Sequence, residues 1–379
     1  MAVAYNLRPR KRVQLHPGHL RLDEAPIPPM YIQKLKQLGY VSVEQVISVA
    51  TMAPARSRLS AFLGADLNGV LAPVLKREIA PQLSFKARTA QYKYGSRLEK
   101  PVRATLPRLD MAAATHLPPV KTAPAPPASP LGNMPDVNFE ADGTMPPVRD
   151  QGNRGTCVAH ASVAATEHYL ITQQGADPKT VDLSEQFLYW DCKGHDGHPN
   201  NEGTWLRVAM PLLFTDGCCL EGIWPYNPNP MPGNEGQGLP PNGKAPDGAQ
   251  SDAATRKIPG AQQLSQNPVS VQEVKDELAQ GRCVAVSVVV YEECWTSPEI
   301  RNTGNVTMPA PEEISNEGHA ICLVGYEDLE GEPELGGGRF ILRNSWDSYW
   351  GVNCEYGTGY GTLPYAYLTT YGTEAYSIK

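Results

Sequence analysis

Cys157 follows two nearby glycines, Gly152 and Gly155, and begins an apolar, alanine-rich run that predicts a helix. A cysteine at the start of a helix lies near unpaired N–H groups and a partial positive charge, which stabilise its thiolate and lower its pKa. Gln151 can donate a side-chain N–H, beside the backbone N–H of Cys157, to an oxyanion that forms on an attacked carbonyl. These residue types in this order predict a cysteine nucleophile for acyl transfer.

A nucleophilic cysteine needs a general base and a group that orients the base, and both stand far downstream. His319 opens one apolar run and Asn344 closes another. Such runs between turn residues are typical of buried strands, whose ends can converge on a helix N-terminus. We expect Cys157 to attack, His319 to accept its proton and later protonate the leaving amine, and Asn344 to hold the imidazole tautomer. Trp346 can cover the contact between the imidazole and the carboxamide and keep water away from it.

Short stretches of the chain match the motifs of a known family in the family's own order: 147–152, 155–157, 183–186, 203–204, 224–226, 318–320, 324–326, 344–346 and 349–351. At these residues the chain resembles the papain-like cysteine peptidases, and within them the bacterial-type members. The resemblance covers about residues 131–379. Each motif alone is weak evidence, whereas the ordered set is specific.

The resemblance implies an α+β, papain-like fold with two lobes. A helical lobe would carry the cysteine, and a β-barrel-like lobe would carry the histidine and the asparagine. The cleft between the lobes is expected to bind an extended protein or peptide substrate. The resemblance also assigns substrate binding to Gly203, whose missing side chain lets backbone meet backbone, and to Gly318 and Trp346. It implies no cofactor and no metal ion.

Several positions depart from the family pattern. Val158 and His160 stand where aromatic residues are common, and Arg154 stands where many secreted members carry a disulfide cysteine. Cys157 and His319 lie 162 residues apart, which exceeds the ~130–150 residues expected for the family. A Pro/Gly-rich insertion between them accounts for the excess. These departures bear on substrate preference more than on catalysis.

Two groups of polar residues have an ordinary structural interpretation that we prefer. His160 lies one helical turn from Cys157 and could tune it, but a packed helix histidine is favoured. The spacing of Cys192, His195 and His198 could suit a metal ion. It lacks a fourth ligand, however, and a Gly/Asp/Pro-rich surface loop is favoured.

The other predicted elements occur in the order that a helical lobe followed by a β lobe requires. We expect helices over 183–191 and 203–216, followed by a long Pro/Gly-rich loop over 225–260. A helix that opens at Ser270 and a strand over 283–291 come next.

Charge divides the chain into two parts. Residues 1–130 contain 19 Lys and Arg against 7 Asp and Glu, a net charge of +12, whereas the remainder carries −19 and the whole chain −7. The two parts therefore attract each other. We expect a basic arm over 1–28, a small all-α domain over 29–80, a basic and then Pro/Ala-rich linker over 81–130, and a peptidase domain over 131–379.

The region 29–80 contains helical patterns joined by a turn at Gly39, with Ser42 as the N-cap of the second helix. It resembles helix-hairpin-helix or SAM-like domains. A DNA-binding hairpin usually has a second glycine near Gly39, where this chain has Tyr40 and Val41, so a nucleic-acid partner is an alternative that we do not favour. We expect this basic domain to dock on the chain's own acidic part as a latch on the cleft, or to recruit a protein partner.

Composition favours a cytoplasmic protein. The chain has eight cysteines, so an odd number remains once the nucleophile is set aside, which favours a reducing compartment. The basic N-terminus is not followed by the apolar stretch of a secretory signal, although secretion by a non-classical route stays open. No apolar run reaches the roughly 18 residues of a membrane span, so no membrane association is expected.

Three function classes fit these observations. The leading class is a cysteine endopeptidase that is restrained by its N-terminal region, as in a zymogen. The second is another thiol acyl-transfer enzyme on the same triad, such as a transpeptidase, deamidase or ester hydrolase. The third is an inactive binding module, against which the intact set of Gln151, Cys157, His319 and Asn344 argues.

Overall fold

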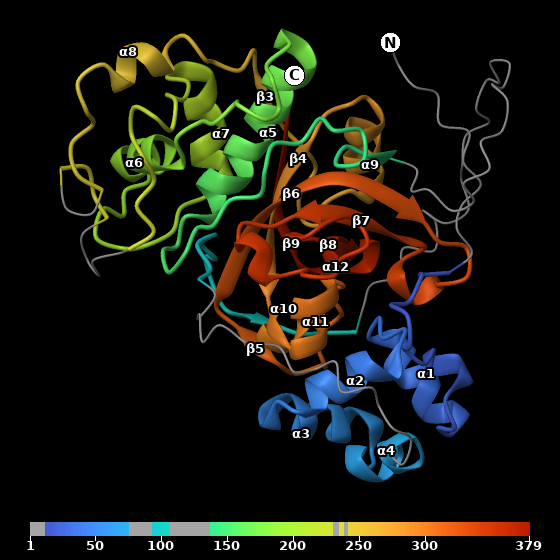
Figure 1. Cartoon of the computed structure of the whole chain (residues 1–379). Coiled ribbons are helices and arrows are strands. Elements are labelled where there is room, and N and C mark those ends of the chain that lie inside the picture. Colours follow the sequence, from blue (N-terminus) through green and yellow to red (C-terminus); the bar gives the residue numbers. More distant parts are fainter. Residues whose placement is uncertain (1–11, 76–92, 107–136, 230–234, 239–241) are drawn as a thin grey trace, which may run out of the picture.

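The structure is a computed structural model that describes residues 12–75, 93–106, 137–229, 235–238 and 242–379 of the chain. Figure 1 shows a group of N-terminal helices, a helical lobe and a β lobe that lies between these two. In the described part of the chain, no helix has the length and apolar character that a bilayer crossing needs.

The N-terminal region is all-α, as the sequence predicts. Its helices are α1 (Pro29–Gln37), α2 (Val43–Ala50), α3 (Ala53–Leu63) and α4 (Leu67–Leu75), after a short 3-10 turn over Leu22–Glu24. Ser42 caps α2, because its hydroxyl accepts from the Gln45 N–H at 3.3 Å while the Gln45 side chain accepts from the Ser42 N–H at 3.2 Å. The kinship with helix-hairpin-helix or SAM-like domains stays a prediction, and residues 76–80 lie outside the described residues.

The helical lobe surrounds one long helix. Its members are α5 (Cys157–Gln174), α6 (Glu185–His195), α7 (Leu206–Thr215) and the short α8 (Ala249–Ala253) inside the predicted long loop. Helix α5 is buried along most of its length, because it packs between α6 and α7 on one side and the β lobe on the other. Its first residue is Cys157, as predicted, and its C-cap is Gly175 in the left-handed conformation.

The β lobe is built on an antiparallel sheet. Among the described residues it has seven strands: β2 (Val137–Asn138), β3 (Ala261–Gln263), β4 (Val284–Val290), β6 (Glu317–Asp328), β7 (Gly338–Arg343), β8 (Tyr360–Pro364) and β9 (Gly372–Ile378). The order is β3-β9-β4-β6-β7-β8, with β2 paired to β6. The described strands do not close on themselves, so the lobe is an open, curved sheet and not a barrel. Strand β4 is buried at every position, which explains its continuous apolar sequence.

Shorter elements cover the sheet. They are α9 (Val271–Ala279), α10 (Glu292–Thr296), α11 (Pro298–Thr303), α12 (Tyr365–Tyr371), the 3-10 turns over Pro333–Leu335 and Asp347–Tyr349, and a two-stranded pair of β1 (Val102–Arg103) with β5 (Ile314–Ser315). The Ser270 hydroxyl accepts from the Glu273 N–H at 3.2 Å and so opens α9, as predicted.

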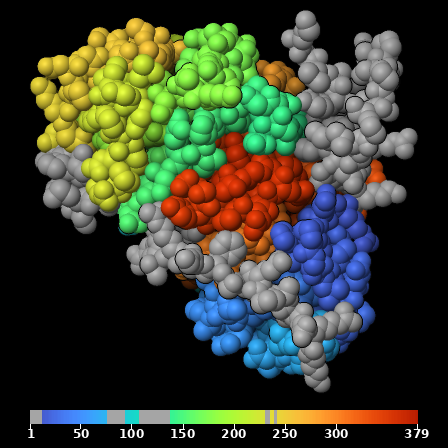
Figure 2. All heavy atoms as spheres, in the orientation of Figure 1, coloured from blue at the N-terminus to red at the C-terminus, as the bar shows by residue number. Residues whose placement is uncertain are grey.

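The N-terminal helices pack on the β lobe, on the side away from the helical lobe (Figures 1 and 2). Helix α2 lies against α11, where the Ser48 hydroxyl accepts from the Glu299 N–H at 2.8 Å. Arg58 of α3 lies 3.1 Å from a carboxylate oxygen of Glu293 and 3.1 Å from one of Glu313. Basic residues of the N-terminal part thus pair with acidic residues of the rest of the chain.

Residues 93–106, which the sequence assigns to a linker, pack against both lobes. Their backbone pairs with β5 through β1, and the backbone N–H of Thr105 donates to the Tyr371 hydroxyl at 3.1 Å. The contacts are made largely by backbone groups, which composition does not reveal. The rest of the predicted linker, 81–92 and 107–130, lies outside the described residues.

Candidate active site

Cys157 lies at the junction of the two lobes. It is the first residue of α5, is fully buried, and follows Thr156 at the N-cap position. Its Sγ accepts a hydrogen bond of 3.3 Å from the backbone N–H of Ala320 on β6. The sulfur therefore faces the strand that carries His319, as the sequence predicts for a nucleophile and its base.

His319 and Asn344 are in direct contact. His319 stands near the start of β6, and Asn344 follows the last residue of β7, the neighbouring strand. The His319 Nε2 and the Asn344 Oδ1 are 2.8 Å apart. The same Oδ1 accepts from the Ser345 N–H at 2.8 Å, so it is an acceptor and the imidazole donates from Nε2. The His319 Nδ1, which has no hydrogen-bond partner among the described residues, is left as the basic nitrogen.

Aromatic rings enclose the imidazole. Trp346 stacks on His319 with ring centroids 4.5 Å apart and an angle of 21° between the ring planes. Trp295 meets the imidazole edge-on at 5.7 Å, and Tyr94 does so at 6.0 Å. The cover that the sequence predicts for Trp346 is therefore present, and two further rings exclude water from the base.

Gln151 lies beside the cysteine with every side-chain polar atom engaged. Its Oε1 accepts from the Ser345 hydroxyl at 2.6 Å, and its Nε2 donates to the carbonyl of Arg154 at 2.9 Å. The Nε2 also donates to the carbonyl of Lys93 at 3.0 Å. Since the last acceptor belongs to the N-terminal part of the chain, this is the donor that would be free for an oxyanion once that segment left.

Residues 93–98 pass through the junction of the lobes. Thr204 donates from its N–H to the Gly95 carbonyl at 2.9 Å and accepts from the Arg97 N–H at 3.0 Å. On the other side, the Ser96 N–H donates to the Gly318 carbonyl at 3.0 Å. Ser96 thereby forms a parallel bridge with Thr204 and an antiparallel bridge with Gly318, so the segment is a strand held by both lobes.

Gly203 and Gly318, predicted to bind substrate, both border this segment. A Cβ on Gly318 would lie 2.2 Å from the Ser96 carbonyl oxygen, and one on Gly203 would lie 2.7 Å from the Gly95 carbonyl oxygen. The missing side chains therefore allow the backbone of this segment to approach closely, while substrate binding by the two glycines stays a prediction. The Gly203 N–H itself donates to the Tyr189 hydroxyl at 3.1 Å. The backbone hydrogen bonds to segment 93–98 are therefore made by the next residue, Thr204.

The buried cysteine and histidine are both held neutral in this closed arrangement. Burial raises the pKa of the Cys157 thiol to about 11, although nearby backbone N–H groups, including those of Ala320, Gly95 and Ser96, oppose the shift. Burial lowers the pKa of His319 to about 4, and the hydrogen bond to Asn344 opposes that shift. A thiolate–imidazolium pair, which water and a helix N-terminus would favour, is thus disfavoured while the segment covers the site.

Sequence reasoning missed two residues that orient the site. Ser345 fixes the Gln151 carboxamide, and Tyr226 donates from its hydroxyl to the Gln151 carbonyl at 2.9 Å. The Tyr226 and Thr156 hydroxyls are also 2.5 Å apart. Both residues stand inside stretches that match the family motifs, 344–346 and 224–226, and this position was the sequence signal that could have identified them.

His160 packs beside the site, and Cys192 and His195 lie on α6, not in the surface loop that was favoured. His160 contacts the Thr156 carbonyl through Nδ1 at 3.1 Å and meets the Tyr226 ring edge-on, as a packed helix histidine does. All eight cysteines lie among the described residues, and each is a free thiol. Within the described ranges, no group of three His, Cys, Asp or Glu is placed to hold a metal ion.

Comparison with known proteins gives consistent matches. An uncharacterised peptidase C1-like protein of Acanthamoeba polyphaga mimivirus is 27% identical over 58% of this chain and 64% of its own length. Cysteine proteinase 1 of Entamoeba histolytica is 27% identical over 57% of this chain and 60% of its own length. The chain thus spans a little under two thirds of these relatives.

The fold has a counterpart among solved structures. Xylellain, a cysteine protease from Xylella fastidiosa, superposes with a TM-score of 0.54 at 24% identity, covering 78% of this chain and 98% of xylellain. This likeness shows a papain-like fold. A family model described as papain family cysteine protease matches residues 135–362, more than half of the chain. The chain therefore belongs to the papain family of cysteine proteases.

Proposed function

We propose that this protein is a cysteine endopeptidase that hydrolyses peptide bonds through a thioacyl-enzyme intermediate. The observation that carries the proposal is the convergence, where the lobes meet, of a helix-start cysteine, a histidine bonded to an asparagine, and a glutamine donor. Cys157 is the nucleophile, His319 the general base and acid, Asn344 the orienting group, and Gln151 the oxyanion donor.

The two half-reactions follow from this geometry. The Cys157 sulfur attacks the substrate carbonyl carbon while its proton passes to His319, and the carbonyl oxygen becomes an oxyanion that Gln151 and the Cys157 N–H stabilise. The imidazolium protonates the departing amine as the C–N bond breaks. Water then loses a proton to His319 and attacks the thioester, which releases the acid and restores the thiol.

The N-terminal part restrains this activity in our proposal. The segment 93–98 lies where the lobes meet and pairs through backbone hydrogen bonds with Thr204 of one lobe and Gly318 of the other. A segment held there blocks the path that an extended peptide substrate would take, so the bound segment acts as an inhibitor. Because it is tethered, its effective concentration at the cleft is high.

The docked helices support the same restraint. Ion pairs join Arg21 to Glu332 and Lys36 to Glu334, in addition to the contacts of Arg58. The charge attraction predicted between the two parts of the chain has a structural basis in these pairs, and salt would weaken the more exposed ones. Between segment 93–98 and the two lobes, the main contacts are backbone hydrogen bonds and not ion pairs.

A peptide library incubated with the protein tests the proposed activity. Mass spectrometry should find new peptide termini with the natural chain and none with Cys157→Ala, while His319→Ala should reduce cleavage by orders of magnitude. Cys354→Ala, at a half-buried thiol away from the site, is the control and should cleave normally. Transfer of the acyl group to added amines in place of water would favour the alternative class of thiol acyl-transfer enzymes. No reaction at all, either in the natural chain or after Gly95→Ala, which should open the cleft, would favour a binding module.

A further inference from the structure

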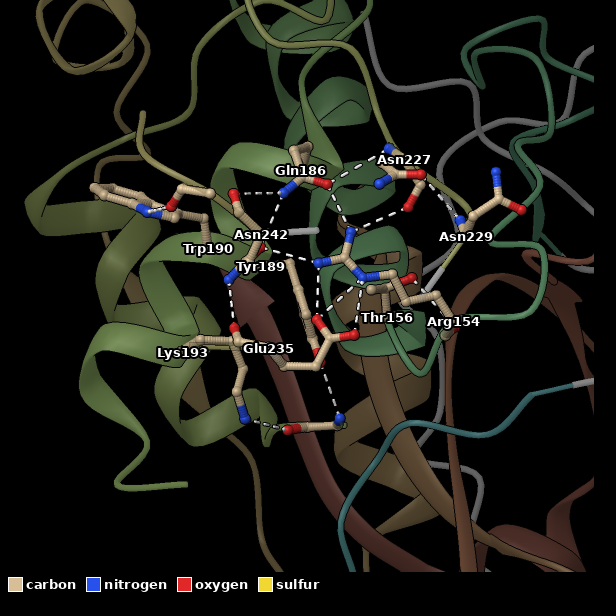
Figure 3. Close-up of polar contacts among 12 residues, drawn as sticks. Arg154, Thr156, Gln186, Tyr189, Trp190, Lys193, Asn227, Asn229, Glu235 and Asn242 are labelled. Atoms are coloured by element: carbon tan, nitrogen blue, oxygen red, sulfur yellow. Dashed lines mark hydrogen bonds and ion pairs between the residues drawn. The ribbon is translucent and has the colours of Figure 1, made fainter. Parts of the chain in front are cut away.

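Arg154, three residues before the proposed nucleophile, has a fully buried guanidinium (Figure 3). An arginine carries five N–H donors in a rigid planar fork. Here each of them has an acceptor inside the protein, in a pocket where a charge without partners would be strongly disfavoured. Because every donor is paired, the Arg154 side chain is held in one position within the helical lobe.

The carboxylate of Glu235 is the main partner. The Arg154 Nε lies 3.1 Å from Oε2, and Nη2 lies 2.8 Å from the same oxygen. The side chains of Gln186 and Asn242 and the backbone carbonyl of Asn227 accept the remaining donors, at 2.6, 3.0 and 3.0 Å. Figure 3 shows these groups arranged around the guanidinium from several directions.

The backbone of Arg154 continues this arrangement into the active site. Its carbonyl oxygen accepts from the Gln151 Nε2 at 2.9 Å and from the Thr156 N–H at 2.8 Å. One of these donors belongs to the proposed oxyanion group, and the other belongs to the residue that precedes Cys157. A shift of the Arg154 backbone would therefore move both the oxyanion donor and the start of α5.

The acceptors come mainly from the long insertion after α7. Asn227, Glu235 and Asn242 lie within the Pro/Gly-rich stretch 225–260, whereas Gln186 lies on α6. The insertion is therefore joined to the turn before α5 by a network of hydrogen bonds around one buried ion pair. No disulfide takes part, since all eight cysteines, each within the described residues, are free.

We propose that Arg154 is a positioning residue, and that its buried fork, held by Glu235 of the long insertion, fixes the turn that aims Gln151 and places Cys157 at the start of α5. This inference rests on the proposed function. The insertion thereby becomes part of the catalytic apparatus and is more than a surface loop. We call the Arg154–Glu235 pair and its hydrogen bonds the Arg154 clamp. Because the oxyanion donor acts chiefly in the transition state, loss of this clamp slows the chemical step and leaves substrate binding nearly unchanged.

A matched pair of double variants separates positioning from stability. Arg154→Met with Glu235→Met removes both charges and keeps the volume, so no buried charge is left unpaired. Arg339→Met with Glu327→Met is the control, because this pair is equally buried, with Nε and Oε2 2.6 Å apart. Glu327 lies near the opposite end of β6 from His319, about 26 Å away at about 3.3 Å per residue.

Kinetics of peptide hydrolysis by the full chain give the first readout. We expect the Arg154/Glu235 variant to lose about tenfold or more in kcat with little change in KM, since a misplacement of about 1 Å can cost about 100-fold. Arg154→Lys should show the same split, because an ammonium keeps the charge and loses the fork. The control variant should keep its kcat. A folded Arg154/Glu235 variant with the kcat of the control would overturn the proposal.

Hydrogen exchange measured by mass spectrometry gives a second readout that does not require activity. Peptides spanning 150–158 should exchange faster in the Arg154/Glu235 variant and at the natural rate in the control. Absence of turnover in both the natural chain and Gly95→Ala, which should open the cleft, would count against the proposed function alone. Unchanged exchange at 150–158 would count against the clamp. If the double variant fails to fold, Glu235→Gln replaces it. Slower turnover together with faster exchange at 150–158 would support the clamp, and natural values of both would overturn it.

Discussion

The Gln151 carboxamide donates to the backbone carbonyl of Lys93 across a distance of 3.0 Å, although the two residues are 58 positions apart in the chain. The group proposed to stabilise the oxyanion is therefore occupied by the protein's own N-terminal part. In the proposed function, catalysis and restraint use the same donor, so we expect removal of the segment both to open the cleft and to free the oxyanion donor.

Gly95→Ala should activate the full-length protein. A Cβ at this position would lie 2.1 Å from the Gly155 carbonyl oxygen, a backbone overlap that the closed arrangement cannot absorb. A loss of about 1.4 kcal/mol in the free energy of closure would raise the open-to-closed ratio about tenfold. Initial rates of peptide hydrolysis measure the effect. Gly260→Ala is the control, because a Cβ there meets no atom within 4 Å; equal rates for the two variants would refute the restraint.

Gln151→Ala should lower kcat by about 100-fold to 1,000-fold, because one oxyanion donor is worth about 2.7–4 kcal/mol. The melting temperature should also fall by several degrees. The Ser345 hydroxyl loses its buried partner, at a cost of about 1–3 kcal/mol, whereas the Arg154 carbonyl keeps its hydrogen bond from the Thr156 N–H. Steady-state kinetics and thermal melts measure the two effects. A normal kcat in the folded variant would show that the residue is only structural.

Acid should favour opening of the cleft. Burial lowers the pKa of His319 to about 4 in the closed arrangement, and departure of the segment removes part of that burial, so the opened site binds a proton more readily than the closed site. The free energy that favours closure therefore falls as the pH drops from about 6.5 to about 4, and it returns as the pH rises. The rate of Cys157 alkylation in the natural chain, divided by the rate in Gly95→Ala at the same pH, should rise as the pH falls from about 6.5 to about 4. A ratio that does not change with pH would contradict the linkage.

Alkali should destabilise the fold around Glu313. Burial raises the pKa of Glu313 to about 9, and its hydrogen bond with Glu293 adds to the shift. Because the folded pKa lies above the usual 4.5, the stabilisation is complete below pH 4.5 and is lost as the pH rises through about 9.

Glu313→Gln removes this ionisation and keeps the hydrogen bonding. Its melting temperature should exceed that of the natural chain by a few degrees at pH 9, and the two should converge near pH 5. Glu312→Gln is the control, because Glu312 is exposed and pairs only at the surface with Arg103. A pH-independent difference between Glu313→Gln and the natural chain would exclude the carboxyl as the cause.

The residues of the proposed reactive centre could be selected from the sequence because their signals are local. A cysteine between glycines and an apolar helix, and a histidine and an asparagine at the ends of apolar runs, each mark a chain position by its neighbours. Ser42 predicted the start of α2 for the same reason, since a capping box needs only residues three apart.

The occupied cleft and the Arg154 clamp were not predictable in this way. Residues 93–98 bind through backbone groups, which every sequence carries, so composition assigned them to a linker. Arg154 and Glu235 are 81 positions apart, and such charges are usually solvated, so no periodicity joins them. The one available hint was an arginine between Gly152 and Gly155, in the turn that precedes Cys157.

The most direct measurement of the central claim is covalent labelling of the Gly95→Ala chain with a peptidyl vinyl sulfone, followed by mass mapping of the modified thiol. All eight cysteines are free, so each is a chemical competitor. The account predicts rapid modification at Cys157 alone, and its near-complete loss in the His319→Ala chain. Rapid labelling of another cysteine while Cys157 stays unmodified would contradict the assignment of the nucleophile.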